Sequence, residues 1–330
     1  MTFAAHDLTL PEFGLGAAGL GNLYTAISEQ DAQDTLEAAM AAGLNYVDTA
    51  PFYGHGLSEQ RVGAHIWASG ETPYLSTKVG RCLEPAGNRL IPDNGFEAPA
   101  PYIPVFDYSA GGIRASFEDS RSRLRVPRVD ALLLHDVGER THGAAHPKIL
   151  AQALEESLPE MASIKWEGGT KWIGLGVNEL DVCREILEHF DLDVLLIAGR
   201  YTLLEHASSL GFLDECHRAG VRVIIGGAFN SGLLAAKPGE AQHYDYAAAP
   251  GWAVNRAAEL QEVCEAFGTC LPAAALKFCK AHPAVVSVIP GARSAQQVRQ
   301  IAEWVSGDID PDLWTALKDR DLISADAPVP

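Results

Sequence analysis

Four side chains with complementary acid-base chemistry stand at comparable places along the chain. Asp48, Lys78 and His135 each follow directly after a short apolar run, and Tyr53 lies just beyond Asp48 in the segment DTAPFYG. A tyrosine titrates at about pH 10, which is too high for useful proton transfer at neutral pH, and a neighbouring ammonium group lowers that value. We therefore expect these residue types to act as one proton-transfer group.

The expected division of work follows from the charge of each group. Lys78 would stabilise the phenolate of Tyr53, and Asp48 would be the counter-ion that keeps a buried lysine charged. His135, as a neutral imidazole, can donate a hydrogen bond to a carbonyl or hydroxyl oxygen and orient it. Lys78 is then a poor Schiff-base nucleophile, which disfavours a lyase barrel.

The elements that must position these residues form a regular alternation. Eight short apolar runs, continuous rather than alternating, predict strands of a parallel sheet buried on both faces, and segments of helical period separate most of them. Eight such units predict a single (β/α)8 barrel over residues 1–330, in which the carboxyl ends of the strands meet and active sites are built. The predicted strands are Phe13–Ala17, Leu44–Val47, Tyr74–Thr77, Val129–Leu134, Trp172–Val177, Val194–Ala198, Val221–Ile225 and Val285–Ile289.

The predicted helices begin and end at recognisable signals. Ser28 caps a helix that Gly43 closes, and Ser294 caps another with Gln297 as its capping-box partner. The helical segments are Ser28–Gly43, Ser58–Trp67, Gly112–Leu124, Ile149–Trp166, Leu180–Phe190, Leu210–Ala219, Trp252–Phe267, Pro272–Ala281 and one that starts at Ser294.

The segment between Lys78 and Gly112 departs from this alternation. It contains five prolines and four glycines, too many for a helix, and it is too long for an ordinary connection. We expect a long loop after the third strand, lying over the active-site end. Its aromatic residues Tyr102, Phe106 and Tyr108 are candidates for the wall of a substrate pocket, and the alternative is that they only hold the loop against the barrel.

The run Gly14-Leu15-Gly16-Ala17-Ala18-Gly19 matches the G-x-G-x-x-G pattern of dinucleotide-binding folds. In those folds the glycines follow a strand and open a helix. Here they coincide with the strand itself, and the next helix starts only at Ser28. We interpret the run as a closely packed first barrel strand.

Charge and composition exclude several classes of protein. Lys and Arg number 25 and Asp and Glu 43, so the net charge is −18, which disfavours nucleic acid or an anionic membrane surface as a partner. No apolar run is long enough to span a membrane, and the N-terminus lacks the pattern of a signal peptide, so a cytoplasmic protein is expected. Six scattered cysteines predict free thiols. His142 and His146 have helical metal spacing, but Gly143 and Pro147 disfavour a helix there, and no metal is expected.

With these residues in their settings DTAPFYG, STKVG and LLLHDVG, the chain resembles the aldo-keto reductase family. The family's tetrad of Asp, Tyr, Lys and His matches Asp48, Tyr53, Lys78 and His135, and the resemblance extends from Phe13 to about Trp304. It implies a (β/α)8 barrel that binds an extended nicotinamide cofactor and transfers hydride at the barrel mouth.

Within the family, the chain is most similar to the bacterial branch of aldose 1-dehydrogenases that act on L-fucose and other D-threo sugars. This similarity implies oxidation of C1 of the sugar to a lactone, with Tyr53 as acid/base and with Phe52, Tyr53, His135 and Phe106 around the substrate. Pyridoxal 4-dehydrogenase is a close relative, so oxidation of pyridoxal to 4-pyridoxolactone stays open. A non-catalytic barrel that binds nicotinamide stays open as well, as does the choice between a monomer and a small homo-oligomer.

The resemblance also implies where the cofactor binds. Asn178 would hold the carboxamide, and Tyr201 or Phe229 would stack on the nicotinamide. NADP-preferring members place two cations around the 2′-phosphate, whereas here Arg293 stands alone with Gln297 in the second position, so NAD is expected and NADP is possible. The cofactor-binding candidates are Asn178, Tyr201, Phe229, Asn230, Ser231, Gly232, Gly291, Arg293 and Gln297.

Overall fold

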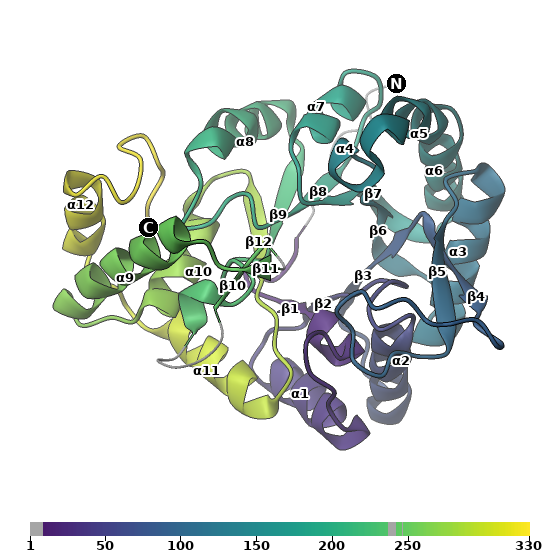
Figure 1. The fold of residues 1–330 in the computed structure, drawn as a ribbon, viewed down its shortest axis with the longest axis horizontal. Coiled ribbons are helices and arrows are strands. Elements are labelled where there is room, and N and C mark those ends of the chain that lie inside the picture. The colour runs from purple at the N-terminus through teal and green to yellow at the C-terminus, as the bar shows by residue number, and fades with distance from the viewer. Residues whose placement is uncertain (1–8, 237–241, 246) are drawn as a thin grey trace.

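Eight parallel strands form the centre of the molecule in a computed structural model that describes residues 9–236, 242–245 and 247–330. The strands lie side by side in the order β1-β2-β3-β6-β7-β8-β9-β12, and bridges from Phe13 to Val288 and from Gly16 to Gly291 join the first strand to the last (Figure 1). The predicted (β/α)8 barrel is therefore confirmed. The strands are β1 (Leu15–Gly16), β2 (Tyr46–Asp48), β3 (Tyr74–Val79), β6 (Val129–His135), β7 (Thr170–Val177), β8 (Val194–Ala198), β9 (Arg222–Gly226) and β12 (Val285–Ile289).

Helices surround this barrel (Figure 1), and each predicted helical segment contains one. Ser28 caps the first of them through a reciprocal pair of bonds with Asp31. The segment predicted as one helix over Ile149–Trp166 is interrupted by a π-helical turn, Ala153–Ser157, because Pro159 has no backbone N–H to continue the α-helical ladder. The helices are α1 (Glu29–Ala41), α2 (Leu57–Ser69), α3 (Ala110–Leu124), α4 (Glu139–His142), α5 (His146–Gln152), α6 (Leu158–Trp166), α7 (Asp181–Leu187), α8 (Ala207–Ala219), α9 (Gly251–Ala266), α10 (Leu271–Ala281), α11 (Ala295–Ser306) and α12 (Asp312–Asp319). None of the helices in the described ranges combines the length and apolarity needed to span a membrane.

The glycine run at the N-terminus is explained by close packing within the barrel. A Cβ atom on Gly14 would lie 2.6 Å from the carbonyl oxygen of Tyr46, and one on Gly19 would lie 2.8 Å from that of Ala292. Only a short 3-10 turn, Ala17–Gly21, follows β1. Gly16 therefore lies in the first barrel strand, Gly14 and Gly19 flank it in close packing, and the run does not open an α-helix as a dinucleotide fingerprint would.

The insertion after β3 is more ordered than the predicted loop. Strands β4 (Arg81–Pro85) and β5 (Tyr102–Phe106) pair antiparallel along their whole length, and only residues 86–101 between them form a loop. Aromatic and β-branched residues give β5 its strand propensity, and Pro104 is tolerated because a two-stranded ribbon has only edge strands. A second small ribbon, β10 (His243–Tyr244) with β11 (Ala247–Ala248), follows β9.

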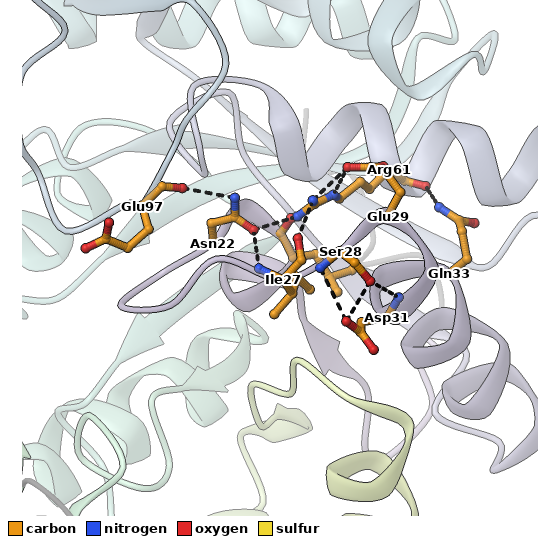
Figure 2. A network of polar contacts seen from close by, with 9 residues as sticks. Asn22, Ile27, Ser28, Glu29, Asp31, Gln33, Arg61 and Glu97 are labelled. Atoms are coloured by element: carbon orange, nitrogen blue, oxygen red, sulfur yellow. Dashed lines mark hydrogen bonds and ion pairs between the residues drawn. The ribbon is translucent and has the colours of Figure 1, made fainter.

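A polar network fixes the insertion to the barrel body, and Figure 2 shows its members. The amide of Asn22 donates to the carbonyl oxygen of Glu97 at 2.9 Å and accepts from Nη1 of Arg61 at 2.8 Å. Arg61, on α2, is buried, and its Nε and Nη2 donate to Glu29 at 2.9 and 2.7 Å. The loop of the insertion is thus connected through one asparagine and one arginine to both α1 and α2.

Candidate active site

Three of the four predicted catalytic residues come from strands that are neighbours in the barrel. Asp48 ends β2, Lys78 lies on β3 and His135 ends β6, and these strands pair in the order β2-β3-β6. The Nζ of Lys78 donates to Oδ2 of Asp48 at 2.7 Å and to the carbonyl oxygen of Thr49 at 2.9 Å. The side chains of Lys78 and Asp48 are only 1% and 3% exposed. The predicted ion pair is present and almost completely removed from water.

Tyr53 lies in the turn after β2 and faces the other three. Its ring centroid lies 4.6 Å from Nζ of Lys78 and 6.1 Å from the imidazole centroid of His135. The turn is held against the loop after β1, because a Cβ atom on Gly54 would lie 2.4 Å from the carbonyl oxygen of Gly21. The structure thus gathers all four residues at the carboxyl ends of the strands.

The acidity of Tyr53 differs from the sequence-based expectation. Burial, followed by the carboxylates of Asp48 and Asp136, raises the pKa of Tyr53 well above its usual value, and the Arg81 cation acts in the opposite direction. The expectation that Lys78 would lower this pKa is wrong for the protein alone. The reason is that burial of the phenol, together with the carboxylates of Asp48 and Asp136, outweighs the effect of the nearby cation. Tyr53 is therefore a neutral phenol at neutral pH.

His135 is held neutral, and its backbone is anchored by a hydrogen bond. Burial, followed by the cations of Arg81 and Lys78, lowers the pKa of His135 well below its usual value. The hydroxyl of Tyr108 donates to the carbonyl oxygen of His135 at 2.8 Å. The Nδ1 atom of His135 is buried and has no hydrogen-bond partner among the described residues. This neutral imidazole matches the predicted role as a hydrogen-bonding group.

An ion pair that the sequence analysis did not single out lies beside the tetrad. Arg81, the first residue of β4, pairs through Nη2 with Asp136, whose Oδ2 lies 3.5 Å from Nε2 of His135. The guanidinium carbon of Arg81 lies 4.0 Å from the ring centroid of Phe52 and 4.8 Å from that of Phe106. Two sequence signals point to this pair: Arg81 is the first cation after Lys78, and Asp136 directly follows His135.

Two of the predicted substrate residues line a cavity next to this ion pair. Phe52 and Phe106, with Arg81 and Asn94, form part of the wall of a small cavity of about 80 Å³. Tyr108 does not, because its ring is buried and its hydroxyl is bonded to the backbone after β6. The expectation that Tyr108 lines a pocket is therefore replaced by a role in positioning His135.

Most of the predicted cofactor residues follow the strands β7, β9 and β12. In the barrel these strands stand in the order β7-β8-β9-β12, so that β8 separates the first two. The side-chain oxygen of Asn230 is buried without a partner among the described residues. The guanidinium of Arg293 contacts the Thr25 hydroxyl at 3.4 Å and has no carboxylate partner in the described ranges. These donors and acceptors suit the carboxamide and phosphate groups of a dinucleotide. The residues placed there are Asn178 after β7, Asn230, Ser231 and Gly232 after β9, and Gly291, Arg293 and Gln297 after β12.

One bond in this region differs from the predicted capping box. Ser294 accepts from the backbone N–H of Gln297 at 3.2 Å, as expected. The side-chain oxygen of Gln297, however, accepts from the backbone N–H of Arg293 at 2.9 Å instead of that of Ser294. Gln297 therefore fixes the backbone of the one cation predicted at this site.

The two aromatic candidates for stacking on the nicotinamide differ in accessibility. Tyr201 is fully buried, and its ring stacks on Phe278 with centroids 5.5 Å apart. No ring face of Tyr201 is accessible to a cofactor, so this assignment is corrected. Phe229 is only partly buried and contacts Trp304 edge to face at 5.9 Å.

The remaining residues that the sequence analysis considered are the cysteines and the pair His142 and His146. All six cysteines are free, as predicted, and burial raises the pKa of the Cys82 thiol to about 11, which makes it unreactive. His142 ends α4 and contacts the Tyr108 hydroxyl at 3.0 Å, whereas His146 begins α5 and contacts Glu185 at 2.9 Å. The two histidines do not share a helix face.

Comparison with known proteins agrees with this geometry. The model of the aldo/keto reductase family matches residues 12–320. The chain is 40% identical to pyridoxal 4-dehydrogenase of Microbacterium luteolum, over 96% of both chains, and 36% identical to D-threo-aldose 1-dehydrogenase of a Pseudomonas species, over 97% of both. Its fold is similar to that of the holo form of an aldo-keto reductase from Bacillus halodurans, with a TM-score of 0.73 and 24% identity over 97% of this chain and 94% of that one. The chain therefore belongs to the aldo/keto reductase family and is an NAD(P)-dependent oxidoreductase.

Proposed function

We propose that the protein oxidises C1 of an aldose of the L-fucose or D-threo type to the lactone, with NAD as the hydride acceptor. The observation that carries the proposal is the buried Lys78–Asp48 pair beneath Tyr53, with the neutral imidazole of His135 against the same ring. Such a cluster can hold a hydroxyl group between a phenol and an imidazole while its proton is removed.

In this proposal the substrate hydroxyl at C1 lies between Tyr53 and His135. Tyr53, as the phenolate, takes the hydroxyl proton as the C1–O bond becomes a carbonyl, and His135 orients the oxygen. The bound oxidised nicotinamide supplies the hydride acceptor and one further positive charge near the phenol. That charge is needed because the pKa of Tyr53 is raised in the protein alone. In the reverse direction, the neutral phenol is already the acid.

The preference for NAD is supported by the charge around Arg293. Its backbone is fixed by Gln297, a neutral side chain at the position where NADP-preferring members carry a second cation. One guanidinium group on a chain of net charge −18 is a weak binding site for the 2′-phosphate of NADP.

Pyridoxal is the second candidate substrate, supported by the 40% identity to a pyridoxal 4-dehydrogenase and by the aromatic wall of Phe52 and Phe106. In water, pyridoxal forms a cyclic hemiacetal, as aldoses do, and its oxidation also gives a lactone. The tetrad would perform the same proton transfer on either ring.

The test is to offer the purified protein NAD or NADP with a panel of aldoses and pyridoxal and to follow the absorbance of reduced nicotinamide. Tyr53→Phe should abolish reduction while cofactor binding, measured by fluorescence titration, stays within a few fold. Tyr74→Phe, at the opposite end of β3, is the matched control and should retain activity. Full activity of Tyr53→Phe would refute the assignment, and no reduction with any substrate would favour a non-catalytic nicotinamide-binding barrel.

A further inference from the structure

The ion pair of Arg81 and Asp136 meets the tetrad at one imidazole nitrogen. The Oδ2 atom of Asp136 pairs with Nη2 of Arg81, and the same oxygen lies 3.5 Å from Nε2 of His135. The side chains of Arg81 and Asp136 are only 12% and 18% exposed, so water and salt screen these charges weakly. Neither residue belongs to the tetrad, yet both act on one of its members.

The position of Asp136 selects the tautomer of His135. The imidazole is neutral, because burial and the cations of Arg81 and Lys78 lower its pKa, so it carries a single ring proton. Its Nδ1 is buried without a hydrogen-bond partner among the described residues, whereas its Nε2 faces a carboxylate oxygen. That oxygen attracts a proton on Nε2, and a proton on Nδ1 would be buried and unpaired. The ring proton therefore resides on Nε2.

This tautomer is the one that can donate to a substrate. Because Nδ1 is buried, Nε2 is the ring nitrogen left to meet the oxygen at C1. A separation of 3.5 Å is too long for a strong hydrogen bond, so Asp136 directs the proton to Nε2 without holding it there. The Nε2–H group stays available for the oxygen that lies between His135 and Tyr53 in the proposed reaction.

Arg81 has a separate effect on the charge of the same ring. A carboxylate close to a histidine favours the imidazolium form. The Arg81 cation opposes this, since it balances Asp136 and lowers the pKa of His135. Lys78 acts in the same direction as Arg81, and Tyr53 is neutral. The charged and titratable groups of the cluster are Asp48 at the end of β2, Tyr53 in the turn after it, Lys78 on β3, Arg81 on β4, His135 at the end of β6 and Asp136.

Backbone bonds hold Asp136 in place beside the imidazole. Its N–H donates to the carbonyl oxygen of Gly176 on β7 at 3.1 Å, and its carbonyl oxygen accepts from the Tyr108 hydroxyl at 3.1 Å. Its φ of 47° lies in the left-handed region, which glycine and asparagine adopt readily. The guanidinium of Arg81 packs on two phenylalanine rings. The insertion thus brings a fixed cation to a carboxylate that the barrel holds.

We propose that Arg81 and Asp136 are positioning residues that keep His135 as the neutral Nε2–H tautomer. Asp136 places the proton, and Arg81 keeps the ring uncharged. The pair connects the insertion after β3 to the reaction, because Arg81 begins β4 and Asp136 directly follows the histidine that ends β6. This inference rests on the proposed function for the role of His135, whereas the tautomer is a property of the protein alone.

The test is ¹⁵N NMR of protein labelled with ¹⁵N-histidine, because the two neutral tautomers and the imidazolium give different ring-nitrogen shifts. The His135 signals are assigned by their loss in His135→Gln. The wild type should show the Nε2–H form at neutral pH. Asp136→Gly, which suits the positive φ, should populate the Nδ1–H form, and Arg81→Met should raise the pH at which His135 becomes protonated by about one unit.

The matched controls are Glu84→Gln and Arg89→Met, which break the exposed ion pair of the same insertion and should leave His135 unchanged. The Nδ1–H form in the wild type, or the same tautomer in Asp136→Gly as in the wild type, would overturn the inference. Protonation of His135 at the same pH in Arg81→Met and in the wild type would overturn it as well.

Turnover provides the second measurement. Asp136→Gly should lower kcat for oxidation by about 10- to 100-fold, the cost of losing one donor to the reacting oxygen, while cofactor binding stays within a few fold. Asp136→Asn should recover most of the activity, because Arg81 only donates and so keeps the amide oxygen toward itself and Nε2. If neither sugars nor pyridoxal are oxidised, the proposed function fails, whereas the tautomers of the wild type and Asp136→Gly still decide the inference.

Discussion

Replacing Asp48 by Asn removes the counter-ion of a lysine that is 1% exposed. Breaking a buried ion pair by removing one partner costs about 3–5 kcal/mol. The Nζ of Lys78 keeps its bond to the Thr49 carbonyl oxygen, and the Ser76 hydroxyl, which donates to Asp48 at 2.7 Å, can still donate to an amide oxygen. We therefore expect the lower end of that range, about 3 kcal/mol.

The assay is a double-mutant cycle with Lys78→Met, read by equilibrium urea unfolding followed by circular dichroism. Among the described residues, Lys78→Met leaves the Asp48 carboxylate with the Ser76 hydroxyl as its side-chain partner, so it should cost a similar amount. The double variant removes both charges and should cost about 1 kcal/mol. The coupling free energy between the two residues should therefore be about 5 kcal/mol, at an unchanged m-value.

The exposed pair of Arg89 and Glu84 provides the control cycle. Its atoms are 2.9 Å apart, but both side chains are 52% exposed, so its coupling free energy should be below about 1 kcal/mol. If the effects at Asp48 and Lys78 add to within about 0.5 kcal/mol, the buried pair is not an energetic unit and the reasoning is refuted.

Three further predictions concern cofactor choice, pH and packing. Gln297→Arg should raise the ratio of kcat/KM for NADP to that for NAD by about tenfold, because it adds a charged hydrogen bond to the 2′-phosphate; an unchanged ratio contradicts the charge argument. Because the pKa of Tyr53 is raised, the phenolate fraction grows with pH, so kcat/KM for oxidation should rise by about tenfold per pH unit from neutral to mildly alkaline pH, while reduction stays flat. Gly174→Ala should destabilise the barrel by more than about 2 kcal/mol, because its Cβ would lie 1.6 Å from the Val194 carbonyl oxygen. Gly211→Ala, on an open helix face, should stabilise it by about 0.5–1 kcal/mol in thermal unfolding.

The features that could be predicted from the sequence are those that depend on short-range pattern. Most of the eight strands are largely apolar runs, since they are buried on both faces, and the residues at the ends of β2, β3 and β6 must meet once the barrel closes. Asp48, Lys78 and His135 were therefore predictable from their places after three of these runs.

The features that were missed depend on contacts between distant segments. The accessibility of Tyr201 depends on Phe278, which lies on α10. The pKa of Tyr53 depends on its burial first, and then on the carboxylates of Asp48 and Asp136. The pairing of β4 with β5 was hidden because prolines and glycines between them indicated a loop. Charge balance and burial at the mouth are properties of the assembled barrel and have no local sequence pattern.

The attachment of residues 86–101 has a consequence for how new specificities arise. The ends of this segment join β4 and β5, and its middle is held by backbone bonds to the short stretch Asn22–Tyr24 and by Asn22 to α2. Backbone bonds do not depend on which side chains the segment carries. A grafted loop of equal length is therefore expected to follow the same course, while the proton-transfer residues on the barrel strands stay unchanged.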